Sequence, residues 1–475
     1  MTEEIYNDDS FRDKISTVDQ EGKRVWINPK KPSGRYYNRR ALFSYGVIAA
    51  LFTIPFIKIN GEPLLLFNII ERKFIIFGKI FWPQDFYLFA LMMITAVVFI
   101  ILFTVVFGRL FCGWACPQTV FMEMVFRKIE YWVEGDWQEQ KRLKKSSWTK
   151  EKIRKRSLKL FLFFIVSFII ANAFLSYIIG IDELAAIVTD SPSNHMGGLI
   201  STIIFSGVFF FVFAYMREQV CIAVCPYGRL QGVLLDKNSI VVAYDHARGE
   251  NRALLKKGED RKANGLGDCV DCHQCVHVCP TGIDIRNGTQ LECTNCTACI
   301  DACDHIMDKL HMERGLIRYA SENTITKKQP LRFTRRIKAY TAVLSLMLIL
   351  VSVLLFTRKD VSFVLLRSPG TLYQEVEKGR YSNIYNYNIT NKTNKEMHLE
   401  ARLIDSDGEI RIIGTGMVLP AAEELEGVIM VILDAKDIKQ LKTDLKIGLY
   451  DGERLIRISK TTFIGPGKIR NREEK

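Results

Sequence analysis

Five segments of the chain contain no Asp, Glu, Lys or Arg and are apolar throughout. A helix that crosses a bilayer needs about 20 apolar residues, with a usual range of roughly 17–25. A helix in a water-soluble protein rarely stays uncharged on every face over this length. We therefore predict a bundle of five transmembrane helices, at Ala41–Ile57, Phe86–Phe107, Leu160–Ile181, Gly197–Met216 and Ala339–Phe356.

Lys and Arg lie mainly on one side of these predicted helices. They are concentrated in residues 1–40, 109–159 and 217–338, whereas the loop Asp182–Met196 has none. Because cytoplasmic loops are enriched in Lys and Arg, the N-terminus is predicted inside and the C-terminal part outside. The net charge of +13 is attributed to these Lys- and Arg-rich segments. It is not attributed to nucleic-acid binding, because no nucleic-acid-binding module is recognisable. The predicted parts are residues 1–40 (cytoplasmic segment), 41–216 (helices one to four), 217–338 (cytoplasmic segment), 339–357 (helix five) and 358–475 (external domain).

The external domain has a β-strand pattern. Short runs of alternating apolar residues are separated by turn residues such as Asp407-Gly408 and Asp451-Gly452. About seven such strands in about a hundred residues predict an immunoglobulin-like β-sandwich. The predicted strands are Val361–Leu366, Ile384–Ile389, Met397–Leu403, Ile410–Ile413, Val428–Leu433, Leu445–Tyr450 and Arg454–Ile458.

A duplicated cysteine run lies in the predicted cytoplasmic segment 217–338. The spacing Cys-x2-Cys-x2-Cys-x3-Cys occurs at residues 269–279 and again at 293–303. It is typical of bacterial ferredoxins with two [4Fe–4S] clusters, in which the fourth Cys of each run ligates the other cluster. Zinc sites more often pair C-x2-C knuckles across a longer loop. We predict one cluster on Cys269, Cys272, Cys275 and Cys303, and a second on Cys279, Cys293, Cys296 and Cys299.

A second motif, C-x3-C-P, also occurs twice. It is found at Cys112–Pro117 and at Cys221–Pro226, each time close to the inner end of a predicted transmembrane helix. In a helix, residues i and i+4 lie on one face, so each motif can present two sulfurs together. Soft thiolates suit Cu(I) or an iron–sulfur centre. Three interpretations remain open for these four cysteines: copper ligands, ligands of a further iron–sulfur centre, or small residues that pack helix ends.

With both motifs in place, the chain resembles the FixG/CcoG/RdxA family of accessory proteins for the assembly of cbb-type cytochrome c oxidase. The resemblance covers nearly the whole chain and rests on the two C-x3-C-P motifs, residues 267–285, Cys299–Asp304 and the C-terminal domain. It implies a cupric reductase, an oxidoreductase that converts Cu(II) to Cu(I) for insertion into the oxidase. It also implies the bacterial cytoplasmic (inner) membrane, with the C-terminal domain in the periplasm. The expected catalytic and copper-binding residues are Cys112, Cys116, Cys221 and Cys225.

The expected architecture is a multi-domain membrane protein. It combines a five-helix transmembrane bundle, an inserted 2[4Fe–4S] bacterial-ferredoxin-like domain and a C-terminal immunoglobulin-like β-sandwich. Expected partners are copper ion, the lipid bilayer, and oxidase assembly factors or copper transporters. The electron donor is not identified, because no G-x-G-x-x-G follows a predicted strand and a nicotinamide or flavin domain is not indicated.

Two other functions compete with copper reduction. The chain can be an electron-transfer polyferredoxin that links the quinone pool to another redox enzyme. Alternatively, it can be a scaffold whose clusters only stabilise its fold. Copper-dependent activity separates the first function from the other two.

Overall fold

The computed structural model describes residues 17–466, apart from residues 19–20, 22, 60, 71–72, 83–84, 257–259, 262, 329–333, 371, 394, 415 and 439. Much of the predicted segment 1–40 therefore lies outside the described residues. The chain divides into two compact units. The first comprises residues up to Phe56 together with Leu91–Leu350, and the second comprises Ile57–Ala90 together with the residues from Val351 onward. Each unit is described by itself.

Four helices among the described residues are long and apolar enough to cross a membrane. Their positions agree with four of the five predicted spans. Helix α7 begins ten residues before Leu160, and its first turns are basic and polar, so the apolar pattern did not reveal them. The third of them, Met196–Met216, consists of α9 (Met196–Phe211) and a π-helical turn, η5 (Val212–Met216). The other three are α2 (Phe86–Phe107), α7 (Lys150–Ile179) and α15 (Arg335–Phe356).

The first predicted span is a different kind of helix, so the count of five is not confirmed. Helix α1 (Arg35–Thr53) is followed by a short 3₁₀ turn, η2 (Ile54–Phe56), that contains Pro55. The first turns of α1 carry three arginines, which leaves only Ala41–Thr53 as its apolar part. Such a segment spans about 20 Å at 1.5 Å per residue, less than the roughly 30 Å of a hydrocarbon core.

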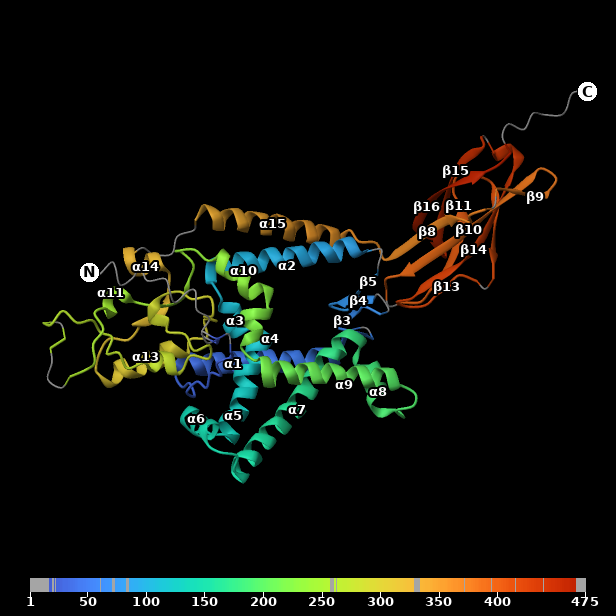
Figure 1. Cartoon of the computed structure of the whole chain (residues 1–475). Helices are drawn as coiled ribbons and strands as arrows, with labels where there is room; N and C mark the ends of the chain where they lie inside the picture. The colour runs from blue at the N-terminus through green and yellow to red at the C-terminus, as the bar shows by residue number, and fades with distance from the viewer. Residues whose placement is uncertain are drawn as a thin grey trace, which may run out of the picture. The chain divides into compact units, whose positions relative to one another are not determined.

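Aromatic side chains hold the centre of the first unit together. Phe126 stacks on Phe213 with ring centroids 4.4 Å apart and meets Phe163 edge-on at 4.8 Å. All three are almost completely buried. These contacts join the segment after α4 (Pro117–Phe121) to α7 and to the end of α9, and α7 and α9 lie side by side in Figure 1.

The remaining elements of the first unit are short. They are α3 (Leu110–Trp114), η4 (Met122–Phe126), α5 (Arg127–Val133), α6 (Trp137–Lys145), α8 (Ile181–Thr189), η6 (Val220–Val224), α10 (Pro226–Leu234), β6 (Val241–Tyr244), α11 (His246–Gly249), α12 (Gln274–His277), η7 (Ile285–Asn287), α13 (Ala298–Lys309), β7 (Ile317–Ala320) and α14 (Glu322–Lys327).

The cysteine-rich segment is fixed to α1 through a long-range helix cap. The Asp301 carboxylate on α13 accepts hydrogen bonds from the backbone amides of Tyr36 (3.1 Å) and Tyr37 (2.7 Å), in the first turn of α1. Asp301 is buried. A carboxylate at a helix N-terminus satisfies unpaired N–H groups and interacts favourably with the helix dipole. Helix α13 accordingly lies beside the beginning of α1 in Figure 1.

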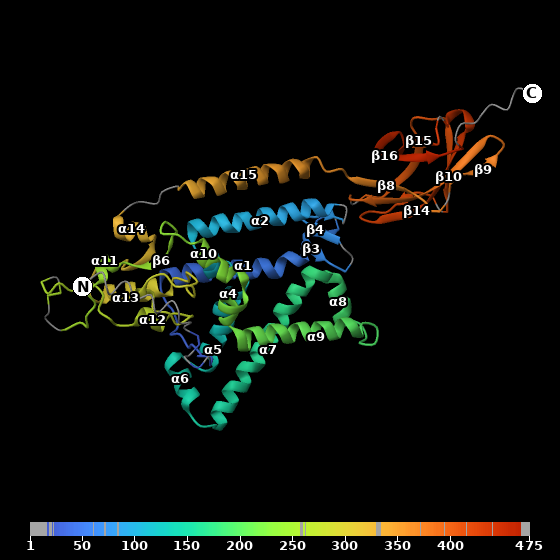
Figure 2. The same cartoon turned by 45° about the horizontal axis from the view of Figure 1, so that its top comes forward.

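The C-terminal part of the second unit consists of two antiparallel sheets that share one hydrophobic core. One sheet has the order β12-β14-β10-β8, with β9 also paired to β10, and the other has the order β13-β11-β15-β16. Figure 2 labels β8, β10 and β14 of the first sheet and β15 and β16 of the second. Phe363 and Tyr385 from the first sheet and Ile447 and Phe463 from the second belong to the same buried core. The strands are β8 (Val361–Arg367), β9 (Gln374–Glu377), β10 (Arg380–Asn391), β11 (Met397–Leu403), β12 (Gly408–Ile413), β13 (Val418–Leu419), β14 (Glu424–Asp434), β15 (Lys442–Asp451) and β16 (Arg454–Ile464).

All seven strands predicted for this domain are present, and two short ones were not predicted. Strand β9 is exposed along its whole length and β13 has two residues, so neither shows the apolar alternation that reveals a strand in sequence.

The loop between α1 and α2 also belongs to the second unit and forms a small sheet of its own. Strand β3 (Leu65–Asn68) pairs with β4 (Lys73–Ile76), which pairs with β5 (Lys79–Phe81). A two-stranded ribbon, β1 (Lys58–Ile59) and β2 (Glu62–Pro63), precedes it. Leu66, Ile75 and Ile80 of the small sheet form a buried cluster with Ala422 of the C-terminal domain. The loop is therefore packed against that domain within one compact unit.

A buried ion triad reinforces this packing. The Asp85 carboxylate lies 2.6 Å from a guanidinium nitrogen of Arg358 and 2.6 Å from Lys392 Nζ. All three side chains are at most 10% exposed. Arg358 also donates a hydrogen bond to the carbonyl of Ile80 in β5. One carboxylate thus pairs with two cations that little water reaches.

Candidate metal centres

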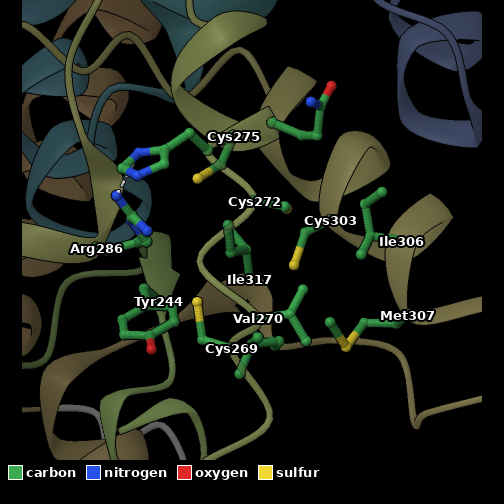
Figure 3. Close-up of a pocket in the computed structure, with 13 residues that line it drawn as sticks. Tyr244, Cys269, Val270, Cys272, Cys275, Arg286, Cys303, Ile306, Met307 and Ile317 are labelled. Carbon is green, nitrogen blue, oxygen red and sulfur yellow. Dashed lines mark hydrogen bonds between the residues drawn. The ribbon is translucent and has the colours of Figure 1, made fainter. Parts of the chain in front are cut away.

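The structure brings the cysteines Cys269, Cys272, Cys275 and Cys303 around one cavity. The labelled cysteines surround a common space in Figure 3. Most of the remaining wall is apolar and includes Val270, Ile306, Met307 and Ile317. This is the first of the two ligand sets predicted from the spacing, including the cysteine that crosses over from the second run.

A second cavity is lined by Cys279, Cys293, Cys296 and Cys299. Cys279 comes from the first run, so the crossing is reciprocal. Cys275 also borders this cavity, which makes the two cavities neighbours that share a wall. Two centres held here would therefore lie close together, as single-electron exchange between them requires.

The two cysteine runs repeat the same backbone conformation. Asp271 and His273 have positive φ angles of 50° and 53°, and the equivalent residues Asn295 and Thr297 have 54° and 68°. Non-glycine residues seldom adopt this left-handed conformation, and they do so mainly where surrounding structure enforces it. In both runs the next residue begins a helix, α12 or α13. The repeated turn wraps the chain around each cavity. The sequence analysis did not predict this turn, because it used only the cysteine spacing.

The donor set fits a polynuclear cluster better than a single ion. Among the described residues, no three Cys, His, Asp or Glu side chains converge closely enough to hold one metal ion. In an iron–sulfur cluster each thiolate binds a different iron, so the sulfurs need not meet at one point. Burial raises the thiol pKa of Cys279 to about 11 and that of Cys293 to about 12. These thiols are protonated at neutral pH without metal, and metal binding must release their protons.

Buried arginines that sequence reasoning missed lie close to both cavities. Arg286 borders the first cavity, and its guanidinium pairs with Asp284 at 2.6 Å and donates to Asp271. Its side chain is 3% exposed, and the hydrogen bond to Asp284 raises the pKa of Arg286 above its ordinary value. Nearby positive charge and hydrogen bonding tune the reduction potential of a cluster. The cysteine spacing does not predict this arginine, because its position beside the cavity depends on how the chain buries it.

Both C-x3-C-P motifs adopt one local geometry, which differs from the continuous helix expected from the i, i+4 spacing. Cys112 lies in α3 and Cys221 in η6, but Cys116 and Cys225 are extended. Pro117 and Pro226 are then the first residues of new helices, α4 and α10. Proline favours this position because its missing N–H would have no partner there, and it disfavours helical conformation in the preceding residue. Each proline therefore starts a helix rather than only ending one.

The four cysteines of these motifs lie within electrostatic reach of one another. Burial, together with neighbouring cysteines of both motifs, raises the thiol pKa of Cys112 to about 11 and that of Cys221 to about 12. Gln231, which is fully buried on α10, donates a hydrogen bond from Nε2 to the sulfur of Cys112 at 3.1 Å. The structure thus gathers both motifs into one group, without arranging three of the sulfurs around a single ion.

The first C-x3-C-P motif is in direct contact with the loop between Cys293 and Cys296, which lines the second cavity. A Cβ atom at Gly113 would come within 2.4 Å of the carbonyl oxygen of Thr294, so only glycine fits there. Arg40 of α1, 2% exposed, donates from Nε to the carbonyl of Gly113 at 2.6 Å and from its guanidinium to that of Cys296 at 3.5 Å. One buried cation therefore joins the motif to the ligand run of the second cavity.

Comparisons with known proteins agree with this arrangement. A family model for a 4Fe-4S dicluster domain matches residues 216–322, and one for a 4Fe-4S binding domain matches residues 89–138, which include Cys112 and Cys116. A third model, an Ig-like fold at the C-terminal of FixG, matches residues 351–466. The chain therefore carries iron–sulfur domains and an Ig-like C-terminal domain.

Three curated proteins are similar to this chain. The proteins RdxA and RdxB of Cereibacter sphaeroides are 31% and 32% identical to it, each over 90% of this chain and 94% of its own length. The nitrogen fixation protein FixG of Rhizobium meliloti is 38% identical over 63% of this chain, and the aligned part covers 58% of that protein.

Proposed function

Because the chain belongs to the FixG family, we propose that it is a membrane-bound oxidoreductase that reduces Cu(II) to Cu(I) for assembly of a cbb-type cytochrome c oxidase. That it is an iron–sulfur redox protein follows from its family and its 4Fe-4S domains. Copper as the substrate, and oxidase assembly factors or copper transporters as partners, are the proposed part.

The observation that carries the proposal is the group of four cysteines beside the second cavity. Cys112, Cys116, Cys221 and Cys225 interact with one another, and the backbone of Gly113 contacts the loop between Cys293 and Cys296. A Cu(I) ion held by two of these thiolates would be adjacent to the predicted cluster site. A merely structural role for the motifs does not require this proximity.

The chemistry needs one electron for each copper ion. When bound, the clusters supply electrons singly. The protein's own contribution is the thiolate site, because soft sulfur ligands favour Cu(I) over Cu(II) and therefore make reduction easier. The buried Arg40 donates to the carbonyls of Gly113 and Cys296 and so ties the first C-x3-C-P motif to the ligand run of the second cavity.

Replacing both Cys221 and Cys225 with Ser is expected to weaken copper binding and to slow Cu(II) reduction by about tenfold or more. Tenfold corresponds to about 1.4 kcal/mol of lost transition-state stabilisation. The iron content should be unchanged, because these cysteines lie outside both ferredoxin-like ligand sets. The measurement uses dithionite-reduced protein with a Cu(I) chelator, after EPR has verified both clusters.

The control variant is Val224→Ser, which alters the same turn at a side chain that is 57% exposed. It should reduce copper at the wild-type rate. A wild-type rate in the double Cys variant would place the reaction elsewhere and leave the motifs as packing elements.

An electron-transfer polyferredoxin is the second candidate function. The 4Fe-4S binding model over residues 89–138 supports it, because that match contains the first C-x3-C-P motif. In this case the four cysteines hold a further iron–sulfur centre, and the chain passes electrons between the quinone pool and another enzyme. Iron analysis of anaerobically purified protein separates the two functions: about eight irons indicate two cubanes, and about twelve indicate a third.

We further propose the bacterial inner membrane as the location, with both cysteine groups on the cytoplasmic side. The Lys and Arg distribution supports this orientation, and thiols that bind metal are kept reduced in the cytoplasm. Reporter fusions after Asp190 and after Lys395 should be active as periplasmic reporters, and a fusion near Asn264 should be active as a cytoplasmic one. A cytoplasmic signal at Lys395 would contradict the orientation.

A further inference from the structure

The corner between α6 and α7 carries a cluster of exposed cations. Residues 137–159 contain ten Lys and Arg but only two acidic residues. Lys155 and Lys159 are paired with carboxylates, and Lys152 is buried. Within the part of the chain that the structure describes, no ion pair involves the other seven cations. Six of them are exposed, and we call these the corner cations: Lys141, Arg142, Lys144, Lys145, Lys150 and Arg154.

Internal contacts hold this corner in a fixed arrangement. The buried side chain of Lys152 donates from Nζ to the carbonyls of Lys144, at 3.2 Å, and Ser146, and so ties the beginning of α7 to the end of α6. At the other end of α6, Trp137 stacks on His277 with ring centroids 4.9 Å apart. In Figures 1 and 2 the corner points away from α9. The corner cations are therefore presented on a scaffold that is already built.

The stability of α7 does not explain the cations at its beginning. Lys150 and Arg154 lie in its first two turns, where the helix dipole disfavours positive charge. They are also four residues apart, a spacing at which like charges repel. The one carboxylate in the first turn, Glu151, is paired with Lys155 at 2.8 Å. A bound anion would relieve both unfavourable effects.

The position of the corner indicates where this anion comes from. Helix α7 is basic up to Lys159 and apolar from Leu160, and it is one of the helices that can cross a membrane. Arg154 is six residues before Leu160, about 9 Å along the helix axis. Trp148 is 70% exposed, and the guanidinium of Arg156 lies 5.3 Å from its ring centroid. Exposed tryptophan is typical of the membrane–water interface, and Lys and Arg clusters beside a spanning helix attract anionic lipids.

We propose that the corner cations and Trp148 form a binding site for the headgroups of anionic phospholipids, in the leaflet at the beginning of α7. The phosphate oxygens accept hydrogen bonds from the Lys and Arg side chains, and the indole of Trp148 lies at the headgroup level. The site differs from general contact with a bilayer because it requires the negative charge of the lipid. It depends neither on copper nor on the iron–sulfur clusters.

The test is competitive lipid binding to the full-length protein in detergent, measured by native mass spectrometry. Phosphatidylglycerol and phosphatidylcholine with identical acyl chains are supplied in equal amounts, and the bound lipids are counted. The wild type should retain phosphatidylglycerol preferentially. Lys150→Glu/Arg154→Glu should lower the ratio of bound phosphatidylglycerol to phosphatidylcholine by about fivefold or more. Helix α7 should be preserved, because carboxylates are favoured at a helix N-terminus, and the iron content should equal that of the wild type.

The matched control is Lys378→Glu/Lys460→Glu, which makes the same change of charge at two exposed lysines of the C-terminal domain. It should keep the wild-type lipid preference. An equal loss in both variants would overturn the proposal, because the effect would then be one of net charge alone. A wild-type protein that retains both lipids equally would also overturn it, as would an unchanged preference in Lys150→Glu/Arg154→Glu.

Discussion

Cys279→Ser should remove the cluster bound by Cys293, Cys296 and Cys299 and leave the other cluster in place. Cys279 belongs to the first run in sequence, but in the structure it borders the second cavity. Cys303→Ser should have the opposite effect, because Cys303 borders the first cavity. In each variant the iron content should fall from about eight to about four per chain. Iron and acid-labile sulfide analysis, with EPR of the reduced protein, measures both effects.

The two variants are controls for each other. They change the same residue type, at equivalent positions of a repeated motif, and should produce distinct residual EPR spectra. If Cys279→Ser instead removed the cluster of its own run, the crossed arrangement would be wrong. Stoichiometric zinc in place of iron would refute the cluster assignment itself.

Asp85→Ala should destabilise the packing of the small sheet on the C-terminal domain by roughly 3–5 kcal/mol, because it leaves two buried cations without their counter-ion. Arg358 and Lys392 both lie 2.6 Å from this carboxylate. Hydrogen exchange of the β3–β5 and β8 amides measures local opening in the intact protein. A loss of this size accelerates exchange by a factor of roughly 10²–10⁴.

The chain offers a matched control in Glu409→Ala. Glu409 and Arg411 are also 2.6 Å apart, but their side chains are 42% and 48% exposed. Exposed ion pairs contribute little to stability, so exchange should change little. A comparable effect in both variants would show that burial of the Asp85 triad is not what makes it stabilising.

Features encoded by local spacing could be predicted from the sequence. The grouping of the cysteines around two cavities, four of the membrane helices and the seven strands with apolar alternation depend on residues close together in the chain or on a regular pattern. That these cysteines ligate two clusters stays a prediction.

Features that depend on contacts between distant residues could not be predicted. Arg40 was counted among the charges that orient the chain, yet it is buried between Gly113 and Cys296. The docking of the small sheet through Asp85 joins residues about 300 positions apart. The apolar content of α1 suggested a membrane span, but its length is set by three arginines at one end and Pro55 at the other.

The cap between Asp301 and α1 has a consequence for the order in which this protein is made. Residues Tyr36 and Tyr37 are synthesised more than 260 positions before the carboxylate that pairs with their amides. By then α2, α7 and α9 have already left the ribosome, and domains generally fold as they emerge. The first turn of α1 is therefore completed only after the cysteine runs of residues 269–303 have been synthesised and folded.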